Sequence, residues 1–157
     1  MKKILILLFL IAIDLITKQI AAYFLYPNGT FEVIGGFFRF AYLENRGAAF
    51  GIFYNSRAFL LIIRAVIIAA LIYYMFKMKD ERNKKIKEIC LTFVIAGAIG
   101  NFVESLIFGY VIDFLEFTFI NFAIFNVADI FIVLGAIAFL TSDFLPNKEA
   151  ASEDSTQ

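Results

Sequence analysis

Residues 110–134 read YVIDFLEFTFINFAIFNVADIFIVL, and this stretch carries two aspartates, Asp113 and Asp129, among almost unbroken apolar residues. A charged side chain in apolar surroundings is costly, so carboxylates are rare there and usually functional. How these two are tolerated depends on the solvent around the chain, which the composition indicates.

The composition is that of a membrane protein. Hydrophobic residues make up 62% of the 157, 21 residues are phenylalanine, and the mean hydropathy is +0.84, well above that of ordinary soluble domains. Apolar runs of about the 20 residues that a bilayer requires lie at roughly 4–25, 58–76, 89–107 and 124–142. The sequence predicts an all-α membrane protein with four transmembrane helices in a single domain, residues 1–146.

The first apolar run has features of a secretory signal peptide, because Met1, Lys2 and Lys3 precede it. It also carries Asp14 and Lys18, and it lacks a convincing cleavage site. We therefore interpret it as a retained span.

Basic residues are distributed unevenly between the segments that join the spans. They gather at the N-terminus, in the loop 77–87 and at Lys148, whereas the segments 26–57 and 108–123 hold only three arginines. The positive-inside rule therefore predicts that both termini are cytoplasmic and that the aspartate-bearing ends of the spans face outward. Residues 147–157 are predicted to form a polar cytoplasmic tail.

The segment 26–57 breaks the helical pattern. It opens with a Pro-Asn-Gly turn, alternates apolar and polar residues through TFEVI (30–34), and resumes an extended pattern through FFRFAYLEN (37–45). Aromatic rings are favourable at a membrane surface. We expect a small extracytoplasmic β-cradle over about 30–55.

The chain has no histidine, and its single cysteine, Cys90, lies at the start of the third predicted span. Without histidine there is neither a Ser-His-Asp triad nor the usual zinc site. Any chemistry must rely on carboxylates, amides, lysine, arginine or tyrosine. We expect no metal, no organic cofactor and no nucleic-acid partner.

Polar residues interrupt three of the spans at matching depths. At about 1.5 Å of rise per residue, three pairs fall in the outer half of the bilayer: Asp14 and Lys18, Asn101 and Glu104, Asn126 and Asp129. The members of each pair are three or four residues apart and share one helix face. Because lipid exposure of a charge is costly, we expect these faces to meet inside the bundle.

Several of these features also have a purely structural interpretation. Asp14 and Lys18 are equally consistent with an internal ion pair, and the asparagines with hydrogen bonds between helices. The segment AGAIG (96–100) is typical of close helix packing. Glu116 and Asp143 are interpreted as solvated residues without a role.

Asp113 and Asp129 are harder to explain in structural terms. If two carboxylates face each other, they share one proton and their pKa values separate. Such a pair holds and activates a water molecule, as in pepsin-like proteases.

Five motifs follow one another along the chain: DLITK (14–18), ENRGAAFG (44–51), GNFVES (100–105), VIDF (111–114) and FNVAD (125–129). In this order they resemble the motifs of the bacterial lipoprotein signal peptidases, also called signal peptidase II. That family consists of four-helix intramembrane aspartyl proteases with an extracytoplasmic β-cradle.

By this resemblance, Asp113 and Asp129 match the catalytic pair. Six further residues match positions that line the site: Asp14, Lys18, Asn45, Gly47, Asn101 and Asn126. The resemblance implies removal of the signal peptide from a diacylglyceryl-modified prolipoprotein, on the amino side of the lipid-modified cysteine. We expect a monomer in the bacterial cytoplasmic (inner) membrane, with this substrate and membrane lipid as its partners.

The third motif departs from the family signature G-N-x-x-D-R. Glu104 stands in place of the aspartate, and Ser105 replaces an arginine that is thought to contact the substrate. Arg64 interrupts the second apolar run at about the same depth as Ser105. We hypothesise that Arg64 faces inward and replaces this guanidinium, reaching a substrate carbonyl or Glu104. The alternative is a lipid-facing side chain that snorkels outward.

Two other functions are consistent with parts of this pattern. Intramembrane carboxylates and lysine also occur in proton- or ion-coupled transporters, and a member of this fold without catalysis would be a scaffold. Against transport, the chain has no internal repeat, and its polar groups do not continue to the cytoplasmic side. The aspartate pair favours a peptidase, whereas Ser105 mildly favours a scaffold.

Overall fold

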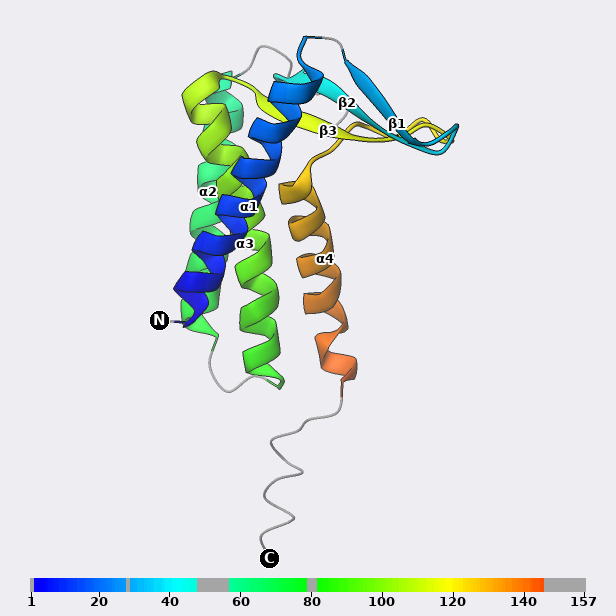
Figure 1. The fold of residues 1–157 in the computed structure, drawn as a ribbon. Helices are drawn as coiled ribbons and strands as arrows, with labels where there is room; N and C mark the ends of the chain where they lie inside the picture. The colour runs from blue at the N-terminus through cyan, green and yellow to red at the C-terminus, as the bar shows by residue number, and fades with distance from the viewer. Residues whose placement is uncertain (1, 28, 48–56, 79–81, 146–157) are drawn as a thin grey trace, which may run out of the picture.

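The computed structural model describes residues 2–27, 29–47, 57–78 and 82–145 (Figure 1). Within these ranges four helices are long and apolar enough to cross a membrane: α1 (Lys2–Leu25), α2 (Arg57–Lys77), α3 (Lys84–Phe108) and α4 (Val127–Thr141), the last extended by the 3₁₀ turn η2 (Ser142–Phe144). The four predicted spans are confirmed. The predicted tail, 147–157, lies outside the described residues.

α3 is the central helix, because it packs against α1, α2 and α4. Its contact with α4 requires small residues: a Cβ on Gly97 would collide with the carbonyl group of Ala128, and one on Gly135 would lie 2.8 Å from the carbonyl oxygen of Cys90. The AGAIG segment therefore serves helix packing, as predicted, and it brings the first turn of α4 against α3.

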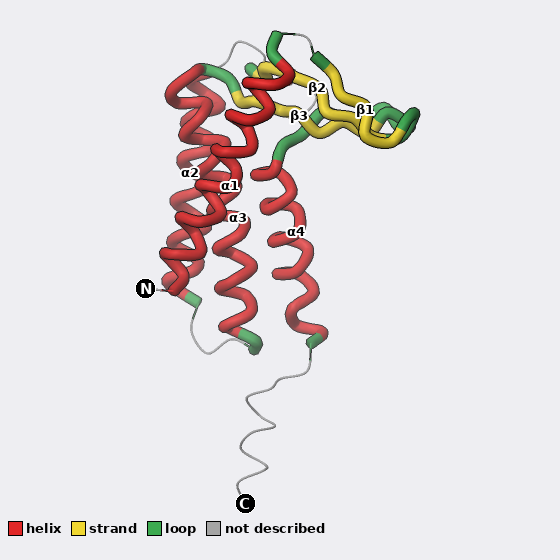
Figure 2. The backbone as a smooth tube through the Cα atoms, viewed as in Figure 1, coloured by secondary structure: helices red, strands yellow, loops and turns green. Residues whose placement is uncertain are grey.

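A three-stranded antiparallel sheet lies across one end of the bundle, opposite the end where α1 begins and α4 ends (Figures 1 and 2). It consists of β1 (Thr30–Ile34), β2 (Phe38–Asn45) and β3 (Val111–Phe117), with β2 in the middle. The small sheet predicted from the alternating pattern is confirmed. The part of the predicted cradle beyond residue 47 lies outside the described residues.

β3 is not among the elements predicted from the sequence. The strand is buried along Val111–Leu115, and its side chains pack against Ala21 and Leu25 of α1. Beyond the strand the chain turns back, so that Leu115 exchanges main-chain hydrogen bonds of 2.8 and 3.0 Å with Phe125. Apart from Asp113 and Glu116, the strand VIDFLEF is apolar, so it lacks the regular alternation that identifies a half-buried strand.

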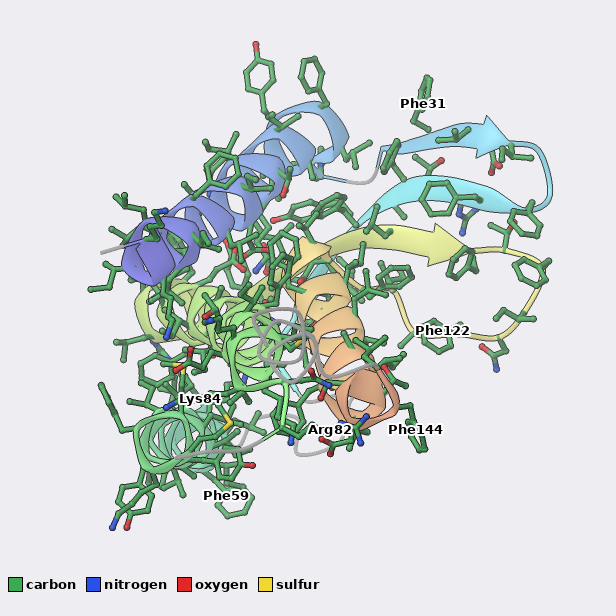
Figure 3. All side chains as sticks on the ribbon, turned by 90° about the horizontal axis from the view of Figure 1, so that it is seen from below. Phe31, Phe59, Arg82, Lys84, Phe122 and Phe144 are labelled. Carbon is green, nitrogen blue, oxygen red and sulfur yellow. The ribbon has the colours of Figure 1, made fainter. Side chains whose placement is uncertain are left out.

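Aromatic side chains cover much of the outer surface. Phe31, Phe59, Phe122 and Phe144 lie at the periphery of the molecule (Figure 3), and all four are exposed. Large exposed apolar surfaces mark sites of contact with a membrane or another protein. Together with the four apolar helices, they indicate that lipid surrounds this fold.

Candidate active site

A cavity of about 730 Å³ lies between the sheet and helices α2, α3 and α4. Seven lining residues are ones that the sequence predicts for the site, namely Gly47 and six with polar side chains: Asn45, Arg64, Asn101, Asp113, Asn126 and Asp129. The rest of the lining is apolar and comes from aromatic and aliphatic residues of β2 and β3, the loop 122–125 and α4. The cavity thus offers a small set of polar groups within a mostly hydrophobic surface, as small-molecule and peptide sites commonly do.

Asp113 enters the cavity from β3, where it pairs with Leu43 of β2. The residue is 2% exposed. The side-chain amide of Asn45 donates to its Oδ2 at 2.8 Å, and that of Asn126 donates to its Oδ1 at 2.6 Å. Each oxygen of this buried carboxylate therefore has a hydrogen-bond partner, as a buried charged group requires.

Asp129 lies in the first turn of α4. Its Oδ2 accepts from the main-chain N–H of Asn126 at 3.1 Å, and Asn126 Oδ1 accepts from the main-chain N–H of Asp129 at 3.1 Å. This reciprocal arrangement is a capping box, here formed by an asparagine and an aspartate three residues apart. Asn101 of α3 donates to the remaining oxygen, Oδ1, at 2.9 Å. A carboxylate at a helix N-terminus is also favoured by the helix dipole.

Asn126 connects the two aspartates and is fully buried. Its Oδ1 caps α4 at Asp129, while its Nδ2 donates to Asp113 and to Asn101 Oδ1. Serine and aspartate are equally good helix caps, but neither has an amide that donates two hydrogen bonds at the same time. The asparagine therefore fixes the relative positions of the two carboxylates.

The pKa of the Asp113 carboxyl is raised from its usual range to about 7. Burial is the main cause, and the negative charge of Asp129 adds to it. The hydrogen bonds from Asn45 and Asn126, and the charge of Lys18, act in the opposite direction. The charge of Asp129 therefore influences the protonation of Asp113, and interacting carboxylates titrate as a pair.

A buried ionic cluster lies behind the cavity, centred on Lys18. Its Nζ is 2.9 Å from Asp14 Oδ2, 3.0 Å from Glu104 Oε2 and 2.7 Å from Asn101 Oδ1. Each of the three charged side chains is at most 1% exposed. The lysine thereby connects to Asn101, which holds Asp129 from the other side.

The two carboxylates of the cluster extend it to main-chain groups. Asp14 Oδ1 accepts from the N–H of Ala128 in α4, and Glu104 Oε2 accepts from the N–H of Ile112 in β3. A Cβ at Gly100 would lie 2.5 Å from Asp14 Oδ2, so the close approach of α1 to α3 depends on this glycine. The cluster therefore joins α1, α3, β3 and α4 close to Asp113 and Asp129.

The structure corrects part of the hypothesis about Arg64. The side chain does face the cavity, but its hydrogen-bond partner among the described residues is the carbonyl oxygen of Gly47, at 3.4 Å. Among the described residues Arg64 forms no ion pair with Glu104, whose Oε2 binds Lys18 Nζ and the N–H of Ile112. Ser105 is buried on α3 and is not among the described residues that line the cavity.

Two kinds of site residue escape the sequence analysis. The first kind is the main-chain N–H groups of Ile112 and Ala128, which cannot be predicted from residue type because every residue except proline has this group. The apolar lining, by contrast, has a weak signal: FTFINFAIF (117–125) is rich in aromatic residues and follows directly on a candidate catalytic residue. Such a stretch is equally typical of a membrane surface, so only its position above α4 reveals that it lines the cavity.

Comparison with known proteins is consistent with this geometry. The model of the family described as signal peptidase (SPase) II matches residues 6–145. The chain is 43% identical over 134 residues to a lipoprotein signal peptidase of Caldanaerobacter subterraneus subsp. tengcongensis, covering 85% of this chain and 90% of that one. It is 42% identical over 138 residues to one of Clostridium tetani, covering 86% and 87%.

A solved structure described as a bacterial membrane enzyme has the same fold. It superposes with a TM-score of 0.81 at 32% identity, over 91% of this chain and 87% of that chain. The bacterial relatives and the four apolar helices identify a bacterial membrane protein. By the match of the family model to nearly the whole chain and by these identities, the chain belongs to the signal peptidase II family.

Proposed function

We propose that this chain removes the signal peptides of prolipoproteins by aspartyl catalysis, with Asp113 and Asp129 as the catalytic pair. The observation that carries the proposal is that two buried carboxylates from separate elements line one cavity and are bridged by Asn126. Family membership supports the hydrolase activity and the prolipoprotein substrate. Family membership also favours a peptidase over a transporter.

The chemistry follows from one proton shared by the pair. The ionised aspartate takes a proton from a water molecule held between the carboxyl groups, while its protonated partner donates a hydrogen bond to the scissile carbonyl oxygen. Attack by the water forms a tetrahedral intermediate. A proton then passes to the leaving nitrogen, the C–N bond breaks, and the pair returns to its singly protonated state. Asn45, Asn101 and Asn126 hold the carboxylates in place.

The substrate is a diacylglyceryl-modified prolipoprotein, cleaved on the amino side of the lipid-modified cysteine. A cavity that combines a few polar groups with an extended apolar lining suits a peptide bond next to acyl chains. The protein acts as a monomer with membrane lipid around it. The residues 1–146 act as a single integral-membrane domain.

The site faces the outside of the cytoplasmic membrane, and both termini are cytoplasmic. In support, α1 begins and α4 ends at one end of the bundle, and the sheet and cavity lie at the other (Figure 1). Lysines concentrate near the first of these ends, at the start of α1 and of α3. This distribution is typical of a cytoplasmic face.

Purified protein in detergent is expected to cleave a prolipoprotein that carries a diacylglyceryl group, and to leave the same precursor intact when that group is absent. The reason is that the apolar part of the cavity binds the lipidated form and places its peptide bond at the aspartates. Gel shift and mass spectrometry of the product identify the cleaved bond. A transporter or a scaffold would cleave neither precursor, so an intact lipidated precursor would refute the proposal.

Cleavage by the wild type is expected to fall as the pH rises through about 7, because the pair loses the shared proton that the raised pKa of Asp113 retains. Asn45→Ala removes a hydrogen bond that stabilises the charged form of Asp113. The alkaline limb of kcat should therefore move to higher pH, and kcat should fall about 10- to 100-fold, as for a lost hydrogen bond to a charged group.

Glu32→Ala is the matched control for this experiment. Glu32 also lies on the sheet, but it is exposed and 3.8 Å from Arg39, away from the cavity. Its pH profile and kcat should equal those of the wild type. A profile that is flat from about pH 6 to 9, or an Asn45→Ala limb that moves to lower pH, would contradict a titrating carboxyl pair.

A further inference from the structure

Arg64 is a charged residue inside a membrane span whose binding capacity is largely unused. It lies seven residues after Arg57, the first residue of α2, and therefore about 10 Å along the helix. A guanidinium has five N–H donors, and the hydrogen bond that the structure gives Arg64 is a long one to the Gly47 carbonyl oxygen, at 3.4 Å. Among the described residues no carboxylate lies within ion-pair distance of it.

The other donors of the cavity are already committed. The amides of Asn45, Asn101 and Asn126 all donate to Asp113 or Asp129. Lys18 lies behind the cavity, where its Nζ binds two carboxylates and an amide oxygen. Arg64 is thus the one cationic side chain among the described residues that line the cavity, and its remaining N–H groups have no hydrogen-bond partner within the described part of the chain.

A signal peptide needs such a donor. Cleavage requires that the peptide leave its helical conformation around the scissile bond, which frees main-chain carbonyl oxygens at membrane depth. Without water to donate hydrogen bonds to these oxygens, each unpaired group costs several kcal/mol. A planar guanidinium offers two parallel N–H groups to neighbouring oxygens, which an ammonium group does not.

The position of Arg64 places these donors close to the reacting groups. Its partner Gly47 donates its own N–H to Asn45 Oδ1 at 3.0 Å, and Asn45 donates to Asp113. Building on the proposed function, we propose that Arg64 is a substrate-binding residue: its guanidinium donates to main-chain carbonyl oxygens of the signal peptide beside the scissile bond. In this role it holds the unwound peptide against the aspartate pair.

The test measures binding separately from chemistry. A fluorescent, diacylglyceryl-modified signal peptide is titrated into the Asp129→Asn protein, in which the proposed catalytic step is blocked, and into the same protein carrying Arg64→Ala, Arg64→Lys or Arg57→Ala. Arg57 is the control, because it lies on the same helix but donates to the carbonyl oxygen of Leu106 outside the cavity. Thermal unfolding of each variant verifies that it is folded.

We expect Arg64→Ala to weaken binding about 10- to 100-fold, the range for hydrogen bonds to a charged donor. Arg64→Lys should recover little of this, and Arg57→Ala should bind as the parent does. In the background with both aspartates intact, Arg64→Ala should raise KM and leave the pH profile of kcat in place.

Three results would overturn the inference. Equal binding by Arg64→Ala and the parent would refute the role of Arg64 and leave the proposed function standing. Full recovery by Arg64→Lys, together with a shifted pH profile in Arg64→Ala, would show that the residue acts through its charge on the aspartates. A peptide that does not bind even the Asp129→Asn parent would refute the proposed function, and this inference with it.

Discussion

Replacing either Asp113 or Asp129 by asparagine is expected to abolish cleavage, with a loss of at least about 1,000-fold in kcat, because general acid–base catalysis by the pair is then lost. An amide has nearly the shape of the carboxyl group, but it cannot take up and release the shared proton. Loss of turnover is measured on the lipidated precursor, and thermal unfolding in detergent verifies that each variant is folded.

Glu116→Gln is the matched control for this change. Glu116 lies in β3, the same strand as Asp113, but it pairs with Arg39 on the sheet, with contacts of 2.7 and 3.0 Å. The sequence interpretation of Glu116 as a solvated residue without a role predicts cleavage at the wild-type rate. Turnover by Asp113→Asn or Asp129→Asn within about tenfold of this control would exclude aspartyl catalysis at the pair.

Lys18→Met is expected to destabilise the protein by about 3–5 kcal/mol, the usual cost of removing one partner of a buried ion pair. Asp14 and Glu104 would then face each other in an apolar interior without a cation. Asn101 would also lose one of the two donors at its Oδ1, with Asn126 remaining, so that its hold on Asp129 is weakened. Equilibrium unfolding in mild detergent measures the stability, and cleavage of the lipidated precursor measures the activity.

Lys3→Met provides the comparison. Lys3 also pairs with a glutamate, Glu88, but half of its side chain is exposed, and exposed pairs contribute at most about 1 kcal/mol. Adding Glu104→Gln to Lys18→Met should recover part of the lost stability, because one uncompensated carboxylate is removed. Equal stabilities of Lys18→Met and Lys3→Met would show that the buried cluster does not hold the helices together.

The four spans and most of the cavity's polar residues are evident from the sequence. Lipid offers no hydrogen bonds to the main chain, so each span must be a long apolar helix by itself. Length and composition of a single segment are therefore sufficient to predict it. Polar residues at matching depths in such helices are driven towards one another, which is why Asp14, Lys18 and Asn101 could be placed in one cluster before any fold was known.

β3 is different, because its identity depends on what surrounds it. A half-buried strand alternates apolar and polar residues, whereas Val111–Leu115 is buried throughout and packs against α1. Its sequence is then indistinguishable from a short piece of buried helix. The VIDF motif therefore identified Asp113, but the strand that carries this residue was not predicted.

The sequence alone determined that this is a four-span membrane protein with two costly carboxylates near one face, because hydropathy and charge belong to each segment separately. Only the tertiary structure decided that Asn126 bridges those carboxylates, that Glu104 binds Lys18 and β3, and that Arg64 is left facing the cavity. Hydrogen bonds act over about 3 Å, so each partner is selected by helix crossings and strand register, which no single segment encodes.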